Sequence, residues 1–274
     1  MTAHSGPSVD PELVSFLSFW ADAGVDVAYA EAAQDRLKPP PPRVMPTRAA
    51  APPALPPAAR AGPSTTSSID ISTALDDARR MAAAAPDLAA LEAAIAAFDG
   101  CPLKTQGAAR AVFARGRPDA PVMIVGEGPG ADEDRQGEPF VGRAGKLLDR
   151  MLAAAGLVDQ VFITNTVFWR PPGNRTPTLA EQAVCRPFVE RAIALVKPKV
   201  LVLAGGASAK SMLNTTEGIL SLHGRWSDWT SEDGQITLPA LPTLHPAFLL
   251  RQPGAKKKAW ADLMTLMARL EDSQ

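Results

Sequence analysis

The stretch VMIVGEGPGADEDRQGEPFVG, residues 122–142, decides the fold class of this chain. An apolar run ends in glycines, and carboxylates follow at Glu127, Asp132, Glu133, Asp134 and Glu138. A short apolar run bounded by glycines is typical of a buried strand. Glycine loops after strands usually hold phosphate. The question is therefore why carboxylates lie where an anion would be expected.

The familiar phosphate loops are excluded by their spacing and charge. GEGPG, residues 126–130, lacks the G-x-G-x-x-G spacing, and no G-K-[ST] follows. A carboxylate at Glu127 would also repel a pyrophosphate. A solvated turn is the alternative interpretation. It suits Asp132 and Asp134, which we take as structural, but it suits Glu127 less well because this residue lies at the strand end.

Outward from this stretch, short apolar runs alternate with amphipathic segments. Strands are expected at 121–125, 161–167, 199–205 and 236–246, and helices at 143–157, 178–196, 206–213 and 256–270. Thr178 and Glu181 form a capping-box pattern. The alternation predicts a three-layer α/β fold, a central parallel sheet of about four strands with helices on both faces. Its site should lie beyond the carboxyl ends of the strands, in the loops 126–140, 165–175, 205–210 and 245–251.

The chain divides into three parts by composition. Residues 1–37 carry apolar residues at helical spacing and predict an N-terminal helical segment, either an arm that docks a partner or a helix packed on the main domain. Residues 38–70 are rich in Pro and Ala, typical of a disordered or polyproline linker. Residues 71–274 form the predicted catalytic domain, which begins with Ala-rich helices broken at Pro86.

The composition further limits the class of protein and its expected partners. An apolar content of 46% supports a real core, and no run approaches the ~18 residues of a membrane span. The N-terminus lacks a secretory pattern, so we expect a cytoplasmic protein, without a membrane partner and monomeric. Two cysteines argue against a disulfide scaffold. A net charge of −1 means that any nucleic-acid contact needs a local basic patch.

Two of the predicted loops carry groups suited to DNA. TLHPAFLLRQP, residues 243–253, places His245 at a strand end, before an apolar protrusion and Arg251. An apolar wedge beside a cation suits insertion into a duplex. In TNTVFWRPPGNRTP, residues 164–177, the amide of Asn165 offers a donor and an acceptor that match the edge of uracil. Arg170 and Arg175 flank a stiff Pro-Gly loop that suits phosphates.

From about residue 98 to 270 the chain resembles the uracil-DNA glycosylase superfamily, specifically its family 4 type. The resemblance is carried by GEGPGADEDRQGEPFVGRAGKLLD, ITNTVFWRPPGNRTPT, CRPFVERAI and LHPAFLLRQP, in matching order and spacing. It implies hydrolysis of the N-glycosidic bond of uracil in DNA by base flipping, which leaves an abasic site. The alternative of another class is a non-catalytic module that binds uracil-containing DNA.

The resemblance also implies residue roles. Glu127 and Gly128 would hold and activate the attacking water, and His245 would sit at O2 of the base. Phe140 would stack on the flipped uracil, and Asn165 would read its edge. The remaining matches are an acidic position near the uracil pocket and two residues that would fill or brace the gap in the duplex: Glu133, Leu249 and Arg251.

The predicted chemistry answers the opening question. The bond breaks through an oxocarbenium-like sugar while the base leaves as an anion. A donor at O2 would stabilise the leaving group, and a carboxylate beside the sugar would stabilise the cation and orient or deprotonate water. The acid is expected because the neighbouring species becomes positive. We expect the glycines to let the DNA backbone approach.

The chain departs from the family pattern at the metal site. The resemblance implies a [4Fe–4S] cluster held by four cysteines, but only Cys101 and Cys185 remain, with Phe98 and Trp169 at the other two positions. Two thiolates cannot hold a cubane in the Cys₄ manner. We therefore expect no cofactor, with Phe98 and Trp169 packed in the vacated space; a cluster with substituted ligands is the alternative.

Two other branches are disfavoured. A covalent branch traps uracil-DNA through a histidine in a basic insert, where this chain has PPGNRTP with Asn174 near the histidine's place. This difference predicts turnover instead of trapping. Family 5 members carry an apolar residue at the position of Glu127.

Overall fold

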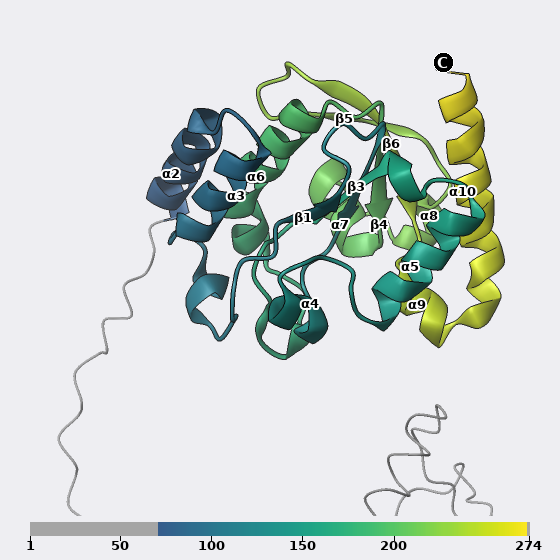
Figure 1. Cartoon of the computed structure of the whole chain (residues 1–274), viewed down its shortest axis with the longest axis horizontal. Coiled ribbons are helices and arrows are strands. Elements are labelled where there is room, and N and C mark those ends of the chain that lie inside the picture. The colour runs from purple at the N-terminus through teal and green to yellow at the C-terminus, as the bar shows by residue number, and fades with distance from the viewer. Residues whose placement is uncertain (1–70, 273–274) are drawn as a thin grey trace, which may run out of the picture. The chain divides into compact units, whose positions relative to one another are not determined.

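The computed structural model describes residues 71–272. The predicted N-terminal segment 1–37 and linker 38–70 lie outside the described residues. The described part is built on a six-stranded sheet with the order β1-β3-β2-β4-β6-β5 (Figure 1).

The four inner strands of the sheet are parallel. They are β2 (Val122–Gly126), β3 (Val161–Asn165), β4 (Val200–Ala204) and β6 (Thr237–Thr243). The prediction of a central parallel sheet of about four strands is confirmed. Two short antiparallel edge strands, β1 (Ala114–Gly116) and β5 (Ser227–Thr230), extend it and were not predicted.

Helices cover both faces of the sheet, as the alternation predicts. On one side lie α2 (Ile71–Ala84), α3 (Leu88–Ala97) and α6 (Leu179–Val196), together with α7 (Gly206–Leu213). On the other side lie α5 (Arg143–Ala154) and α10 (Lys256–Glu271) (Figure 1). Alternate side chains of β2 explain the two cores: Met123 and Val125 face the first layer, and Val122 and Ile124 face the second.

Shorter elements complete the described part. The helices α4 (Ala131–Gln136), α8 (Ile219–Leu222) and α9 (Pro246–Arg251) follow strands β2, β4 and β6 in the chain. Four short 3₁₀ turns are η1 (Pro102–Thr105), η2 (Val158–Gln160), η3 (Pro172–Asn174) and η4 (Pro253–Ala255). No helix among residues 71–272 is long and apolar enough to cross a bilayer.

The predicted capping box of α6 is present. The Thr178 hydroxyl accepts from the Glu181 N–H at 3.3 Å, and the Glu181 carboxylate accepts from the Thr178 N–H at 2.7 Å. These bonds satisfy amide donors that the first turn of a helix leaves without partners. They also fix the point at which the 171–177 loop meets α6.

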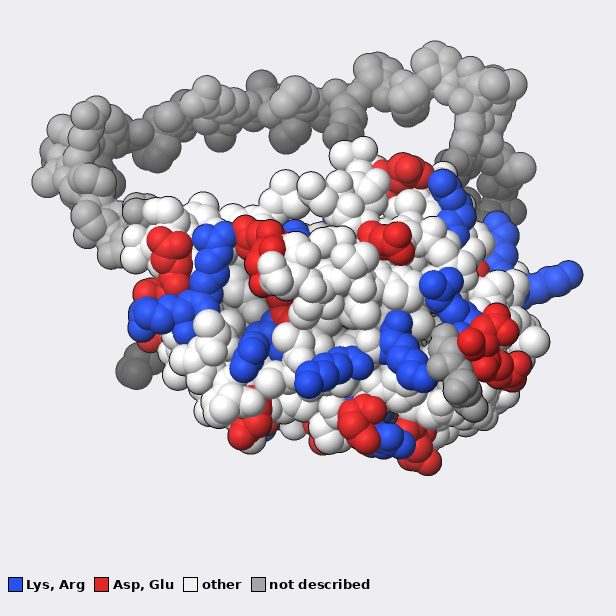
Figure 2. Space-filling model, turned by 90° about the horizontal axis from the view of Figure 1, so that it is seen from above, with Lys and Arg blue, Asp and Glu red and all other residues white. Residues whose placement is uncertain are grey.

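Strand register brings the functional loops together. Gly126 of β2 pairs with Asn165 of β3, and Ala204 of β4 pairs with Thr243 of β6, so four parallel strands end at one edge of the sheet. Helices α4 and α9, which follow two of these ends, lie at the bottom of Figure 1. Figure 2 views the molecule from the opposite side and shows basic and acidic side chains interspersed there.

Candidate active site at the carboxyl ends of the strands

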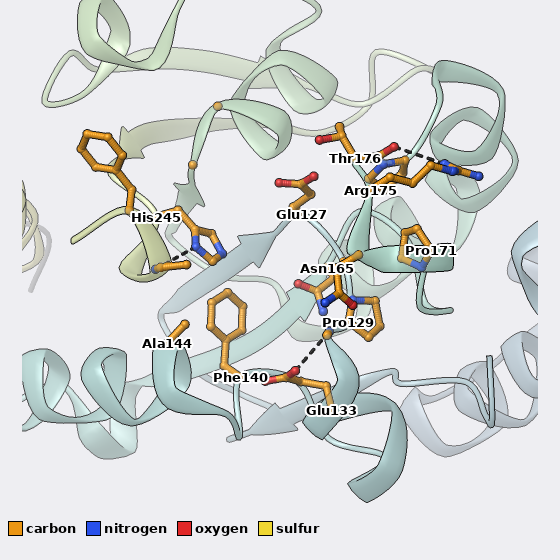
Figure 3. A pocket seen from close by; sticks show the side chains of 18 of the residues that line it. Glu127, Pro129, Glu133, Phe140, Ala144, Asn165, Pro171, Arg175, Thr176 and His245 are labelled. Atoms are coloured by element: carbon orange, nitrogen blue, oxygen red, sulfur yellow. Dashed lines mark hydrogen bonds between the residues drawn. The ribbon is translucent and has the colours of Figure 1, made fainter. Parts of the chain in front are cut away.

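A pocket of about 600 Å³ opens at the carboxyl ends of the parallel strands (Figure 3). All four predicted loops contribute to its wall. Eight predicted site residues line it: Glu127, Gly128, Glu133, Phe140, Asn165, Arg175, His245 and Arg251. Thr176, Pro177 and Ile219 also line the pocket but lie outside the predicted loops, and their residue types give no specific signal of a site.

Glu127 directly follows β2 and is half-buried. Its carboxylate points into the pocket between His245 and Arg175 (Figure 3). The Thr166 hydroxyl donates to the Glu127 carbonyl at 2.6 Å and so fixes its backbone. No hydrogen-bond partner for the carboxylate exists among residues 71–272, which leaves both oxygens available to a ligand. Thr166 was missed because a hydroxyl next to Asn165 gives no specific signal.

Asn165 ends β3 with only 1% of its surface exposed, and Gly126 makes room for it. A Cβ at position 126 would lie 2.4 Å from Asn165 Oδ1 and 2.6 Å from the Phe140 ring. Only glycine therefore allows these two side chains to meet at the pocket floor. The sequence analysis expects the glycines of this loop to let the DNA backbone approach. Gly126 instead makes room for protein side chains.

Phe140 forms an aromatic wall of the pocket. Its backbone is left-handed, with φ of 56°, a strained conformation for a bulky residue. Gly145 permits the close approach of α5, because a Cβ there would lie 1.6 Å from the Phe140 carbonyl oxygen. The Phe140 and His245 ring centroids are 5.6 Å apart with planes at 30°. A residue keeps such a conformation only where the surrounding structure holds it in place.

Glu133 holds the loop that carries Phe140. One carboxylate oxygen accepts from the N–H groups of Val141 and Gly142 at 3.0 and 2.9 Å, and the other accepts from Gly130 N–H at 3.1 Å. Glu133 therefore lines the pocket but acts on the loop through these bonds. The structural interpretation of the neighbouring acids agrees with their contacts, since Asp134 accepts from Ala109 N–H at 2.8 Å.

His245 is the N-cap of α9, and this role determines which nitrogen carries its proton. Nδ1 accepts from the Ala247 N–H at 3.1 Å, so a neutral ring has its proton on Nε2. Burial, and after it the nearby Arg251 cation, lower the pKa of His245 to about 4 against the opposing effect of Glu133. The pocket is thus lined by a neutral imidazole that can donate from Nε2.

The predicted wedge is only partly correct. Leu249 is fully buried in a cluster with Leu147, Leu244 and Ala259, so it packs inside the protein and is not presented to a duplex. The alternating pattern could not show this, because 246–251 forms helix α9 instead of an exposed protrusion. Phe248 and the exposed Arg251 line the pocket mouth from the same helix.

The two arginines of the 170–175 loop have protein partners. Arg170 donates to Asn174 Oδ1 at 2.7 Å and does not line the pocket. Arg175 donates to both carboxylate oxygens of Glu181, at 2.7 and 2.8 Å. This pairing lowers the pKa of Glu181, so the charge predicted for phosphate is largely neutralised.

The cysteines lie away from the pocket. Cys101 Sγ and Cys185 Sγ are 3.9 Å apart, and both thiols are free and fully buried. Burial raises the pKa of Cys185. Phe98 and Trp169 are also buried, with ring centroids 6.4 Å apart. Among residues 71–272, no group of three or more His, Cys, Asp or Glu side chains could hold a metal ion. These side chains do not fit a four-thiolate cluster.

The comparisons with known proteins agree with this geometry. A model described as the uracil DNA glycosylase superfamily matches residues 113–264. The chain is 42% identical over 153 residues to a type-4 uracil-DNA glycosylase of Sulfurisphaera tokodaii, covering 54% of this chain and 69% of the relative. The type-4 uracil-DNA glycosylase of Thermotoga maritima is 39% identical over 153 residues, 55% of this chain and 77% of the relative. That of Pyrobaculum aerophilum is 38% identical over 182 residues, 65% of this chain and 91% of the relative.

Proposed function

Since this chain belongs to the uracil DNA glycosylase superfamily, in its type-4 branch, we propose that its pocket hydrolyses the bond between uracil and deoxyribose in DNA. Proteins of this family remove uracil from DNA during DNA repair. The finer steps, extrusion of the base and release of an abasic site, form the proposal.

One observation carries the proposal. An unpartnered carboxylate, a buried amide and a neutral imidazole, from Glu127, Asn165 and His245, line one pocket from three different strand ends. A carboxylate suits a cationic sugar, an amide suits the edge of a base, and an imidazole N–H suits an anionic leaving group. Uracil attached to deoxyribose presents all three counterparts.

Recognition follows from the pocket wall. The extruded base would stack on the Phe140 ring, at a cost in unstacking of a few kcal/mol. The Asn165 amide would donate to O4 and accept from N3–H of uracil. Cytosine has its donor and acceptor reversed at these atoms, so it would leave the buried amide without matched partners. Discrimination then arises from an unpaired polar group inside the pocket.

Bond cleavage uses His245 and Glu127 on opposite sides of the scissile bond. As the C1′–N1 bond breaks, both bonding electrons stay with uracil, and His245 Nε2–H donates to the negative O2. Glu127 stabilises the positive sugar and orients water, whose oxygen bonds to C1′. The water loses a proton to the carboxylate, which gives it up again as the uracil anion is protonated, and the products are uracil and an abasic site. We propose that this chemistry proceeds without an iron–sulfur cluster.

Binding of DNA would use the exposed Arg251 at the pocket mouth. Phe248, which lines the pocket from the same helix, would contact the gap that the extruded nucleotide leaves. Arg170 remains a candidate phosphate contact outside the pocket. Leu249 could take part only if it left its buried cluster.

The test is excision from a uracil-containing oligonucleotide, detected by alkaline cleavage at the abasic site. We expect Glu127→Gln to lower kcat by about 10²–10⁴-fold, because a positioned acid–base group contributes on this order. Asn165→Ala should also abolish efficient turnover. Glu138→Gln is the matched control, since Glu138 is an exposed carboxylate of the same loop outside the pocket. A wild type that binds the oligonucleotide but never cleaves would instead be a binding module.

A further inference from the structure

A second hollow, of about 320 Å³, lies between α5 and α10. Leu147 and Met151 line it from α5, and Lys256, Lys257 and Trp260 line it from α10. We call it the α5–α10 groove. Trp260 keeps 39% of its surface exposed. The groove therefore combines an exposed indole, an apolar floor and two ammonium groups, with no carboxylate in its lining.

The lysines of the groove lie where a positive charge destabilises their own helix. Lys256, Lys257 and Lys258 occupy the first turn of α10, which contains no acidic residue. Cations at a helix N-terminus are unfavourable, because the backbone dipole is positive there. Among residues 71–272, none of the three forms an ion pair. Helix stability therefore does not explain them, and an external anion would.

Two chain segments contribute residues both to the groove and to the candidate active site. On α5, Ala144 lines the pocket and Leu147 lines the groove, about 4.5 Å further along the helix axis. On the other side, Arg251 lines the pocket and the turn η4 leads directly to Lys256. The groove and the pocket are therefore neighbours along α5 and along residues 251–256.

We propose that the α5–α10 groove binds the base of an unpaired nucleotide close to the extruded uracil, on the same strand. Trp260 stacks on the base, and Lys256 and Lys257 contact the phosphates on either side. Aromatic platforms beside cations are the usual means of holding single-stranded DNA. Bases within a duplex are stacked and paired, so the groove gives the enzyme a preference for uracil in unpaired DNA. This inference rests on the proposed function.

Substrates with a single missing base test the groove. Single-stranded oligonucleotides would carry one uracil and, in turn, an abasic analogue at each of the three positions on either side. For the wild type we expect KM to rise about 5- to 10-fold at one position, with kcat unchanged. Trp260→Ala should show the raised KM on the intact strand and no further rise when that base is missing. Trp260→Phe, which keeps an aromatic face, should recover most of the affinity.

Substitution of two lysines, one in the groove and one outside it, tests whether the groove contacts phosphates. Lys257→Gln should lower the slope of log affinity against log salt for a uracil-free single strand by about 0.7, the value for one phosphate. Lys197→Gln is the control, since Lys197 is exposed and precedes β4, at the opposite edge of the sheet. Unchanged KM for Trp260→Ala, together with an unchanged slope for Lys257→Gln, would overturn the proposal while leaving uracil excision intact. A groove that instead retains a carboxylate-rich peptide would also overturn it.

Discussion

At the scale of single residues, His245 is the group whose protonation the structure defines most closely. Its Nδ1 is occupied by the Ala247 N–H, and burial together with Arg251 lowers its pKa to about 4. The ring is therefore neutral across the ordinary working range of an enzyme. A neutral donor gives up less solvation on burial than a cation would, yet it still supplies a hydrogen bond to a developing anion.

This protonation state predicts a pH profile. Uracil excision should show no inflection from His245 near pH 6.5, and any loss caused by its protonation should appear only as pH falls toward about 4. The unfolded chain takes up this proton near 6.5. The stabilising contribution is therefore complete above about 6.5 and is lost between 6.5 and 4. An NMR titration, assigned with His245→Gln, measures the pKa directly, and a midpoint near 6.5 would contradict it.

At the scale of elements, the 171–177 loop and α6 are joined by Arg175 and Glu181. The guanidinium donates to both oxygens of a carboxylate that is only 5% exposed, and the same carboxylate caps α6. The sequence showed an arginine in a stiff loop and a capping box, but it did not show that they share one acid. A cation predicted to bind DNA thus stabilises a loop–helix junction.

The structural role of Arg175 and the proposed DNA-binding role of Arg251 can be distinguished by experiment. Arg175→Ala should lower the free energy of unfolding by about 1–3 kcal/mol, because it leaves hydrogen bonds of a buried carboxylate unmade. The salt dependence of DNA binding should stay unchanged. Arg251→Ala should do the reverse, lowering the salt slope by roughly one unit with little effect on stability. Denaturant melts and DNA titrations of both variants measure the contrast, which a reduced slope for Arg175→Ala would contradict.

All four inner strands could be predicted from the sequence. β2, β3 and β4 are mainly apolar and buried along their whole length, so their positions can be read without tertiary information, whereas β6 is only partly buried. The edge strands β1 and β5 are short and mixed in character, and only pairing with β3 and β6 makes them strands. The burial of Leu249 depends on α5 and α10 in the same way. Local sequence predicts which strand end carries a group, whereas its partners come from distant elements.

At the scale of the whole molecule, the two cysteines belong to a core that also contains several aromatic rings. Phe98 packs edge-on against Phe188, with centroids 5.1 Å apart, and Trp169 contacts Phe168 at 6.2 Å. These contacts join the segment that follows α3, the segment that follows β3, and α6 within one core. Aromatic packing therefore links the parts of the chain that a four-cysteine cluster would link.

This arrangement predicts a protein that needs no iron. The purified wild type should contain no stoichiometric iron or sulfide, show no visible absorption band and excise uracil. Cys185→Ser should keep most of that activity, since the thiols lie outside the pocket. Phe98→Cys combined with Trp169→Cys is the positive control, because it supplies four thiols in which a cluster could assemble. Four iron atoms per wild-type chain would contradict the prediction.

The dispersal of the pocket over four strand ends has a consequence for synthesis on the ribosome. Glu127 and Asn165 emerge early, but His245 follows β6, the last strand of the described part. Until β6 pairs with β4, nascent chains hold an acid and an amide without the imidazole that receives the departing base. A chain that ends before His245 would therefore lack the proposed hydrogen-bond donor to the leaving base, whereas one that ends after α9 would hold all three groups.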